Sequence, residues 1–230
     1  MSEMLPLFPL STVLFPGMRL PLHVFEERYR TLMADLLAGP EPRQFGVIAI
    51  KSGREVGATG AAALHEVGCV AVIRQVAQHP DGRYDLQTVG TERFRLASVD
   101  QSLAYLRGEV ELLPDGVVEP GAADPGAAEA APVVVRQVQA GFRAYLNALA
   151  DQGGGVISVA DLPDEPVLLS YVIGAAMIID LPERQSLLAA PDALSRLRLE
   201  RSLLVRETAM LRATTSRPAP DYAHEQFSPN

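Results

Sequence analysis

The spacing of hydrophobic residues changes from a period of two to a helical period near the start of the chain. Two stretches, roughly 3–7 and 20–24, combine apolar residues with prolines. Proline keeps the preceding residue extended and suits strand starts and edges, so both stretches are predicted to be short strands. Apolar residues then recur at helical spacing, namely Tyr29, Leu32, Met33, Leu36 and Leu37. They predict an amphipathic helix that ends at Gly39-Pro40.

The segment between the two strands contains a turn signal. Pro16-Gly17 suits the central positions of a type II turn, in which the glycine takes a positive φ. The same segment holds more apolar surface than a connecting loop needs.

Alternating and β-branched residues continue the strand pattern as far as residue 113. The expected strands span 44–51, 62–78, 83–89, 94–99 and 103–113. Asp81-Gly82 predicts a tight hairpin, because this pair tolerates the positive φ that such turns require. Gly68 interrupts an apolar stretch and predicts a bulge or a close backbone approach. The glycines within 52–60 predict a mobile loop.

The pattern changes after residue 115. Residues 116–131 are rich in Pro, Gly and Ala and are predicted to be a linker. Only helical spacing follows, and the expected helices span 132–150, 166–179, 183–189 and 192–213, with Asp192 as the N-cap of the last. The predicted fold is therefore α+β: a β-rich subdomain at 1–115, a helical subdomain at 132–215 and a disordered tail at 216–230.

Composition narrows the classes of function. The formal net charge of −8 argues against a sequence-independent nucleic-acid binder, which needs a basic surface. The single cysteine, Cys69, rules out an internal disulfide and fits a reducing cytoplasm. The N-terminus lacks the pattern of a signal peptide, and the most apolar run, 167–179, is too short to span a membrane. We therefore expect a cytoplasmic protein with no membrane partner.

Three separated blocks resemble one known family. Residues 5–33 (LPLFPLSTVLFPGMRLPLHVFEERYRTLM), 66–96 and 181–211 are similar, in that order, to the N-terminal domain of Lon proteases. The resemblance implies a PUA-like pseudo-barrel followed by a helical subdomain. Residues assigned to structural motifs are Gly17, Arg28, Tyr29, Gly68, Asp81, Gly82, Gly90, Arg93 and Phe94. Within this set, Gly90, Arg93 and Phe94 belong to a Gly-x-x-Arg-Phe-Arg turn.

The catalytic parts of full-length Lon proteases have no counterpart in this sequence. Those enzymes use an ATPase with a P-loop and a Ser-Lys dyad, whereas no G-x-x-x-x-G-K-[ST] occurs here. The only lysine, Lys51, precedes the nearby glycines, which is the wrong order for a phosphate loop, and a dyad would have to use that same lysine. We expect a non-catalytic, free-standing substrate-binding domain that needs no cofactor and ends where the family's ATPase would begin.

Other polar residues give weaker signals of chemistry. His65 and Cys69, four apart on a strand, lie about 13 Å apart, so Cys69 is expected to pack as a small hydrophobe. The histidines are scattered along the sequence, so no metal site is expected. In Arg93-Phe94-Arg95 we expect Phe94 to point inward and both arginines outward. Glu26 and Arg30 are expected to pair on the polar face of the first helix.

The leading functional hypothesis is a module that binds exposed apolar segments of unfolded or damaged polypeptides, with a separate protease as a further candidate partner. The residues proposed to line its cleft, between the two subdomains, are Phe15, Pro16, Met18, Leu20 and His23. A role for all five in the core or the turn remains an alternative. Two other functions stay open: an adaptor for a specific folded partner, and a PUA-like RNA-binding protein. The sequence does not determine the oligomeric state.

Overall fold

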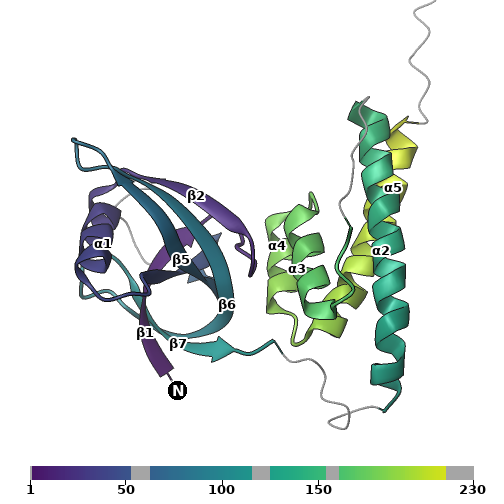
Figure 1. Ribbon diagram of the computed structural model, residues 1–230, viewed down its shortest axis with the longest axis horizontal. Helices are drawn as coiled ribbons and strands as arrows, with labels where there is room; N and C mark the ends of the chain where they lie inside the picture. Colours follow the sequence, from purple (N-terminus) through teal and green to yellow (C-terminus); the bar gives the residue numbers. More distant parts are fainter. Residues whose placement is uncertain (1, 53–62, 116–124, 154–160, 216–230) are drawn as a thin grey trace, which may run out of the picture.

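The computed structural model describes residues 2–52, 63–115, 125–153 and 161–215, which form a β-rich part followed by a helical part (Figure 1). The β-rich part contains β1 (Ser2–Leu10), β2 (Arg19–Val24), α1 (Glu27–Ala38), β3 (Gln44–Ser52), β4 (Ala63–Leu64), β5 (Val67–Gln78), β6 (Tyr84–Asp100) and β7 (Arg107–Leu113). The helical part contains α2 (Pro125–Gly153), α3 (Pro166–Ala176), α4 (Leu181–Ala189) and α5 (Ala193–Thr215). The predicted α+β class is confirmed.

The sheet closes on itself through β1. Residues 2–6 of β1 pair antiparallel with β7, and residues 7–10 pair parallel with β3. Because the order β1-β7-β6-β5-β3 returns to β1, these strands form a closed pseudo-barrel, as the family resemblance implied. Strand β2 lies outside this ring and pairs with β6. Closure leaves few strand edges for unwanted pairing.

Strand β6 is continuous where the sequence predicted two strands separated by a turn. Its residues from 84 to 100 pair in succession with β2, β5 and β7. The predicted turn beginning at Gly90 is wrong. This glycine lies within the strand, at a point where another segment of backbone approaches it closely. A Cβ atom at Gly90 would lie 2.4 Å from the backbone oxygen of Phe15. Gly90 therefore lets β6 pass directly beneath the Phe15 segment.

Helix α1 packs on the barrel through the predicted apolar face. Its buried residues Tyr29, Leu32 and Met33 join a core that includes Cys69, which packs as a small hydrophobe as predicted. The polar face differs from expectation. Glu26 pairs with Arg28 at 3.1 Å, not with Arg30.

Arg30 instead ties α1 to the β5–β6 hairpin. It pairs with Glu27, and its Nε donates to the carbonyl oxygen of Gly82 at 2.9 Å. Gly82 has φ +82°, as an Asp-Gly hairpin requires, and the carboxylate of Asp81 accepts from the backbone N–H of Arg83. The predicted hairpin is confirmed.

The helices follow the predicted order with shifted boundaries. Helix α2 begins at Pro125 and not at 132, so the end of the expected linker is helical. The alanines there favour helix, and proline is tolerated at a first turn. Helix α3 ends at Ala176, three residues before the predicted end. Asp192 caps α5 as predicted, since its Oδ1 accepts from the N–H of Ser195 at 2.8 Å.

The two parts meet at an apolar contact. Helices α3 and α4 lie between the barrel and the α2–α5 pair (Figure 1). Phe15 is completely buried there and packs near Tyr171, with ring centroids 6.4 Å apart. The side chain of Gln185 on α4 donates to the carbonyl oxygen of Val67 on β5. The contact is therefore filled by side chains from both parts.

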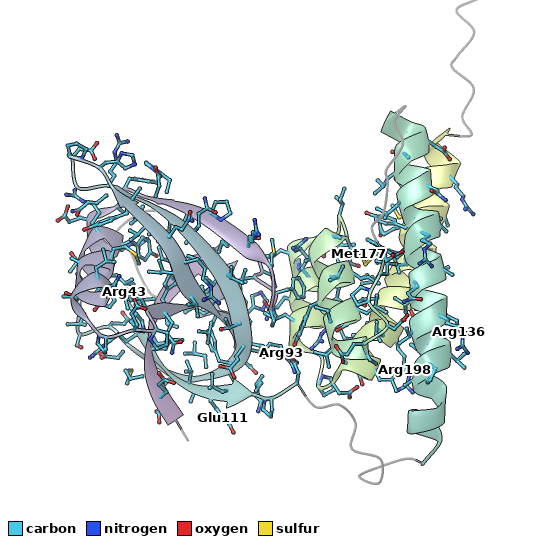
Figure 2. All side chains as sticks on the ribbon, viewed as in Figure 1. Arg43, Arg93, Glu111, Arg136, Met177 and Arg198 are labelled. Atoms are coloured by element: carbon cyan, nitrogen blue, oxygen red, sulfur yellow. The ribbon has the colours of Figure 1, made fainter. Side chains whose placement is uncertain are left out.

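A buried ionic network joins the same surfaces, and Arg93 is its centre. Arg93 is 1% exposed, so the expectation that it points outward is wrong; Figure 2 shows it where the barrel faces the helices. Its guanidinium donates to the carbonyl oxygens of Leu188 and Ala190, at 2.9 and 2.6 Å, and pairs with Asp115 at 3.0 Å. The helices cover this face of β6, and that cover buries a side chain that an isolated barrel would expose.

Arg196 of α5 approaches the same carboxylate from the helical side. It is fully buried, donates to the carbonyl oxygen of Leu187, and lies 4.2 Å over the ring of Tyr171. The hydroxyl of Tyr171 donates to Asp115. The Asp115 carboxylate thus contacts Arg93 of β6 and Tyr171 of α3, and Arg196 of α5 lies 3.7 Å from it.

Three expected features lie wholly or partly outside the described residues: the loop at 52–60, the linker at 116–131 and the tail at 216–230. The division into two subdomains at the predicted boundaries stays a prediction. Among the described helices, none combines the length and apolar character that a membrane span would need.

Candidate functional site

A groove with a volume of about 200 Å³ lies between the end of β1 and the β2–α1 junction. It is lined by Phe8, Pro9, Leu10, Leu22, Val24, Phe25 and Tyr29, together with His23 and Glu26. All of these residues come from the β-rich part, so this groove is not the cleft between subdomains that we predicted. Its volume is below the roughly 300–1,000 Å³ of small-molecule sites and suits one or two amino-acid side chains.

The inner wall of the groove is buried and its rim is exposed. Phe8 and Tyr29 are buried and stacked, with ring centroids 4.0 Å apart and an interplanar angle of 15°. The guanidinium of Arg28 lies 4.5 Å from the centroid of Tyr29, so both predicted motif residues of α1 hold this wall. Phe25, in contrast, is 54% exposed. An exposed aromatic ring beside an apolar groove is a feature of binding surfaces.

One edge of β2 has no strand partner within the described part of the chain. Among the described strands β2 pairs only with β6. The N–H of Gly90 donates to the carbonyl oxygen of Met18, so position 18 and every second residue after it face β6. The backbone groups of Arg19, Pro21 and His23 therefore point away from β6. Pro21 sits where its missing N–H costs no ladder hydrogen bond, as expected of an edge strand.

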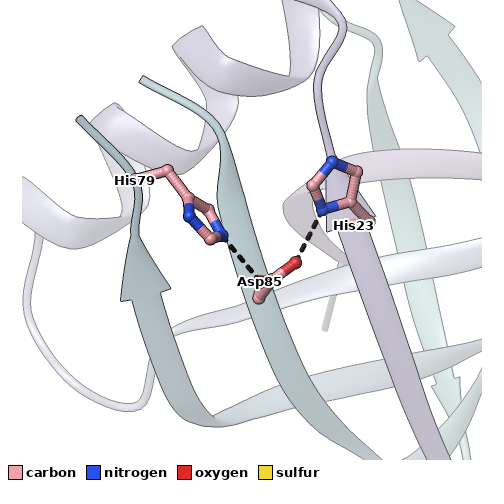
Figure 3. A group of neighbouring side chains, drawn as sticks. All are labelled: His23, His79 and Asp85. Carbon is pink, nitrogen blue, oxygen red and sulfur yellow. Dashed lines mark hydrogen bonds and ion pairs between the residues drawn. The ribbon is translucent and has the colours of Figure 1, made fainter. Parts of the chain in front are cut away.

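A polar cluster adjoins the groove at His23. The Nδ1 of His23 lies 2.6 Å from one carboxylate oxygen of Asp85, and the Nε2 of His79 lies 2.7 Å from the other (Figure 3). Hydrogen bonds from both imidazoles lower the pKa of the Asp85 carboxyl, and the bond from His23 has the larger effect. Asp85 therefore stays ionised near neutral pH and holds both imidazoles.

The structure separates the five residues that we predicted to line a cleft. Phe15 and Pro16 are buried, Phe15 at the contact with the helices, so neither offers surface to a partner. Met18 and Leu20 are half-buried and pack against the core. His23 is the predicted residue that lines the groove. The turn that carries them is as predicted, since Gly17 has φ +79° and the N–H of Met18 donates to the carbonyl oxygen of Phe15.

Sequence reasoning did not find Phe25, His79 or Asp85. His79 and Asp85 flank the predicted hairpin, so its pairing alone could have placed them on neighbouring strands. His23 joins them only through the pairing of β2 with β6, between residues 62 positions apart. Local pattern contains no signal for that pairing.

This architecture is shared with solved structures. The Lon N-terminal domain protein from Xanthomonas campestris aligns with a TM-score of 0.57 and 26% identity, over 88% of this chain and 98% of that chain. The N-terminal domain of Mycobacterium avium complex Lon protease aligns with a TM-score of 0.58 and 18% identity, over 90% and 98% of the two chains. The second likeness shows the fold alone. The fold is thus that of Lon N-terminal domains.

Sequence comparison adds the family. A family model described as the ATP-dependent protease La (LON) substrate-binding domain matches residues 4–206. The chain belongs to this family. It is 33% identical to Lon protease of Paraburkholderia phytofirmans over 199 residues, and 28% identical to Lon protease 2 of Syntrophobacter fumaroxidans over 195 residues. These alignments cover 85% and 84% of this chain but 23% of each relative, so the chain spans about a quarter of their length.

Proposed function

We propose that this protein recognises exposed apolar segments of unfolded or damaged polypeptides, and that it acts by binding alone, without a cofactor. The family's description as a substrate-binding domain supports a recognition role. The observation that carries the proposal is the apolar groove beside the free edge of β2, with Phe25 half exposed at its rim. A folded protein buries its apolar side chains, whereas an unfolded one presents them on extended chain.

The groove and the edge strand together suit an extended polypeptide. A bound segment would add its backbone alongside Arg19, Pro21 and His23 and insert an apolar side chain beside Phe25. Backbone hydrogen bonds of this kind give affinity that depends little on sequence, while the groove selects apolar side chains. A binder of many unfolded clients needs that combination. Delivery of the client to a separate protease in the cytoplasm belongs to the same proposal.

Calorimetry with a chemically reduced and alkylated model polypeptide, which stays unfolded in buffer, tests this proposal. We expect modest, micromolar affinity, because the client loses conformational freedom on binding, and a negative heat-capacity change from buried apolar surface. Phe25→Ser should weaken binding about fivefold or more. Val205→Ser is the matched control, since Val205 is 68% exposed on α5, away from the groove, and its variant should bind like the wild type.

Three outcomes would contradict the proposal: absence of binding at high micromolar polypeptide, equal loss in both variants, or equal affinity for the folded form of the same polypeptide. A short RNA is titrated in parallel at two salt concentrations. Contact with apolar groups responds weakly to salt, whereas phosphate contacts weaken steeply as salt rises. Salt-sensitive RNA binding without polypeptide binding would favour the RNA-binding alternative.

A further inference from the structure

Three side chains with metal-binding atoms converge on the outer surface of the barrel. His23 is on β2, Asp85 is on β6, and His79 lies directly after β5 (Figure 3). One nitrogen from each imidazole and one oxygen from the carboxylate all lie within 4.8 Å of one another. In the sequence His23 lies 62 positions before Asp85, and the scattered histidines predict no site. The tertiary structure brings them together.

Two backbone pairings hold this cluster in place. His23 lies directly opposite Asp85 in the β2–β6 ladder. The backbone N–H of His79 donates to the carbonyl oxygen of Arg83, which closes the β5–β6 hairpin and places His79 beside Asp85. Strand pairing therefore fixes the three Cα positions. The side chains themselves are 47%, 39% and 53% exposed for His23, His79 and Asp85, so an ion can reach them from solvent.

We infer that His23, His79 and Asp85 form a binding site for a divalent transition-metal ion, with Zn²⁺ as the ion that the ligand set fits best. Two imidazole nitrogens and one carboxylate oxygen are ligands that Zn²⁺ prefers, whereas Mg²⁺ and Ca²⁺ prefer oxygen alone. Ligand bonds of about 2.0–2.2 Å place the donor atoms of a tetrahedral site about 3.3 Å apart. The imidazole nitrogens lie 2.6 and 2.7 Å from the two carboxylate oxygens, so the exposed side chains would rotate to reach that spacing.

Three protein ligands leave one position of a tetrahedral ion open. Water can fill that position, and so can a donor group from a bound molecule. Because His23 also lines the groove, the ion would lie beside it and would connect β2 to the β5–β6 hairpin. We therefore expect the ion to stabilise the edge strand. This inference stands without the proposed function, since it depends on the three ligands alone.

Calorimetric titration of the protein, freed of any histidine tag, with Zn²⁺ in a non-chelating buffer tests the inference. The expected result is one equivalent bound with a dissociation constant in the micromolar range, and no heat with Mg²⁺. His79→Gln and Asp85→Asn should each weaken Zn²⁺ binding at least tenfold. His65→Gln is the matched control, because His65 is partly exposed on the same barrel but outside the cluster. It should bind as the wild type does.

Thermal unfolding supplies the second measurement. Zn²⁺ should raise the melting temperature of the wild type and of His65→Gln, because an ion that binds only the folded state stabilises it. At the same Zn²⁺ concentration it should raise the melting temperatures of His79→Gln and Asp85→Asn clearly less, because their sites bind the ion more weakly. Without metal, all of these variants should melt cooperatively, which shows that they fold. Binding that persists in both cluster variants, equal loss in the His65 variant, or no binding at millimolar Zn²⁺ would overturn the inference and leave the cluster a structural cross-strand contact.

Discussion

At the scale of the residue, Glu200 carries an unusual carboxyl group. It is fully buried on α5, and among the described residues neither of its oxygens has a hydrogen-bond partner. Burial raises the pKa of this carboxyl well above its ordinary value, and nearby Arg196 opposes the rise only in part. Burial thus favours the neutral form of Glu200, because ionisation would place a carboxylate without a hydrogen-bond partner in the interior.

This raised pKa predicts how stability depends on pH. Above the ordinary pKa of about 4.3, the unfolded chain releases the Glu200 proton while the folded protein keeps it. The folded state then binds more protons, so stability falls as pH rises, by about 1.4 kcal/mol per pH unit until the folded pKa is reached. Glu200→Gln removes this contribution. We expect the variant to gain stability over the wild type as pH rises from 5, measured by urea unfolding at each pH.

Other groups titrate in both proteins, so the difference between the two curves isolates Glu200. At pH 4 the wild type and the glutamine variant should differ little. Parallel curves from pH 4 to pH 8 would show that Glu200 has an ordinary pKa in the folded state.

At the scale of the element, close strand packing depends on a glycine. A Cβ atom at Gly68 would lie 2.3 Å from the ring of Phe94 and 2.6 Å from the carbonyl oxygen of Val47. The sequence left a bulge and a close approach open at Gly68, and the structure shows the close approach. The β5 backbone lies against the completely buried ring of Phe94. The absent side chain therefore sets the distance between the strand and the core.

Gly68→Ala is expected to destabilise the protein by about 1–3 kcal/mol or more, since backbone and a buried ring must shift to admit the methyl group. Gly141→Ala serves as the control. At Gly141, within α2, a Cβ atom would lie 3.6 Å from Leu204, an ordinary contact, so alanine should stabilise by about 0.5–1 kcal/mol. Denaturant unfolding measures both. A neutral Gly68→Ala would mean that the barrel is more loosely packed than the structure indicates.

At the scale of the whole molecule, the barrel and helices are joined by the buried network around Arg93. Its charge is compensated by Asp115 and by carbonyl oxygens of the helical part. Such a network contributes to the relative placement of the two parts as well as to stability, because guanidinium hydrogen bonds are directional. The groove lies outside this contact, so changes in the network should affect the fold before they affect binding.

Arg93→Ala should cost about 3–5 kcal/mol, because the helix carbonyls lose their donor and Asp115 keeps only Tyr171 and the more distant Arg196. Arg95→Ala is the matched control: Arg95 is exposed two positions along the same strand, and its loss should change stability by less than about 0.5 kcal/mol. Thermal and urea unfolding measure both variants. Arg93→Lys keeps the charge without the planar fork and should fall between them. Equal stability of the two alanine variants would show that the network contributes nothing net.

The sequence alone determined the elements whose causes are local. Helical spacing places α1, the positive φ of glycine explains the turns at Gly17 and Gly82, and a short polar side chain begins α5 at Asp192. Each depends on residues a few positions apart, so a pattern along the chain contains the whole signal. The change from strand to helical spacing also predicted the order of the parts, and the family resemblance implied the same order, which the structure shows.

Only the tertiary structure decided which side chains meet. It buried Phe15 and Arg93, which the sequence placed at a cleft and on the surface, because helices far along the chain cover them. It also joined His23, His79 and Asp85 through strand pairing across 62 residues. The alternation of side chains along a strand predicts which of them share a face of the sheet. It does not predict what packs against that face. The burial of Phe15 and the ion pair of Arg93 with Asp115 depend on that second surface, which only the folded chain supplies.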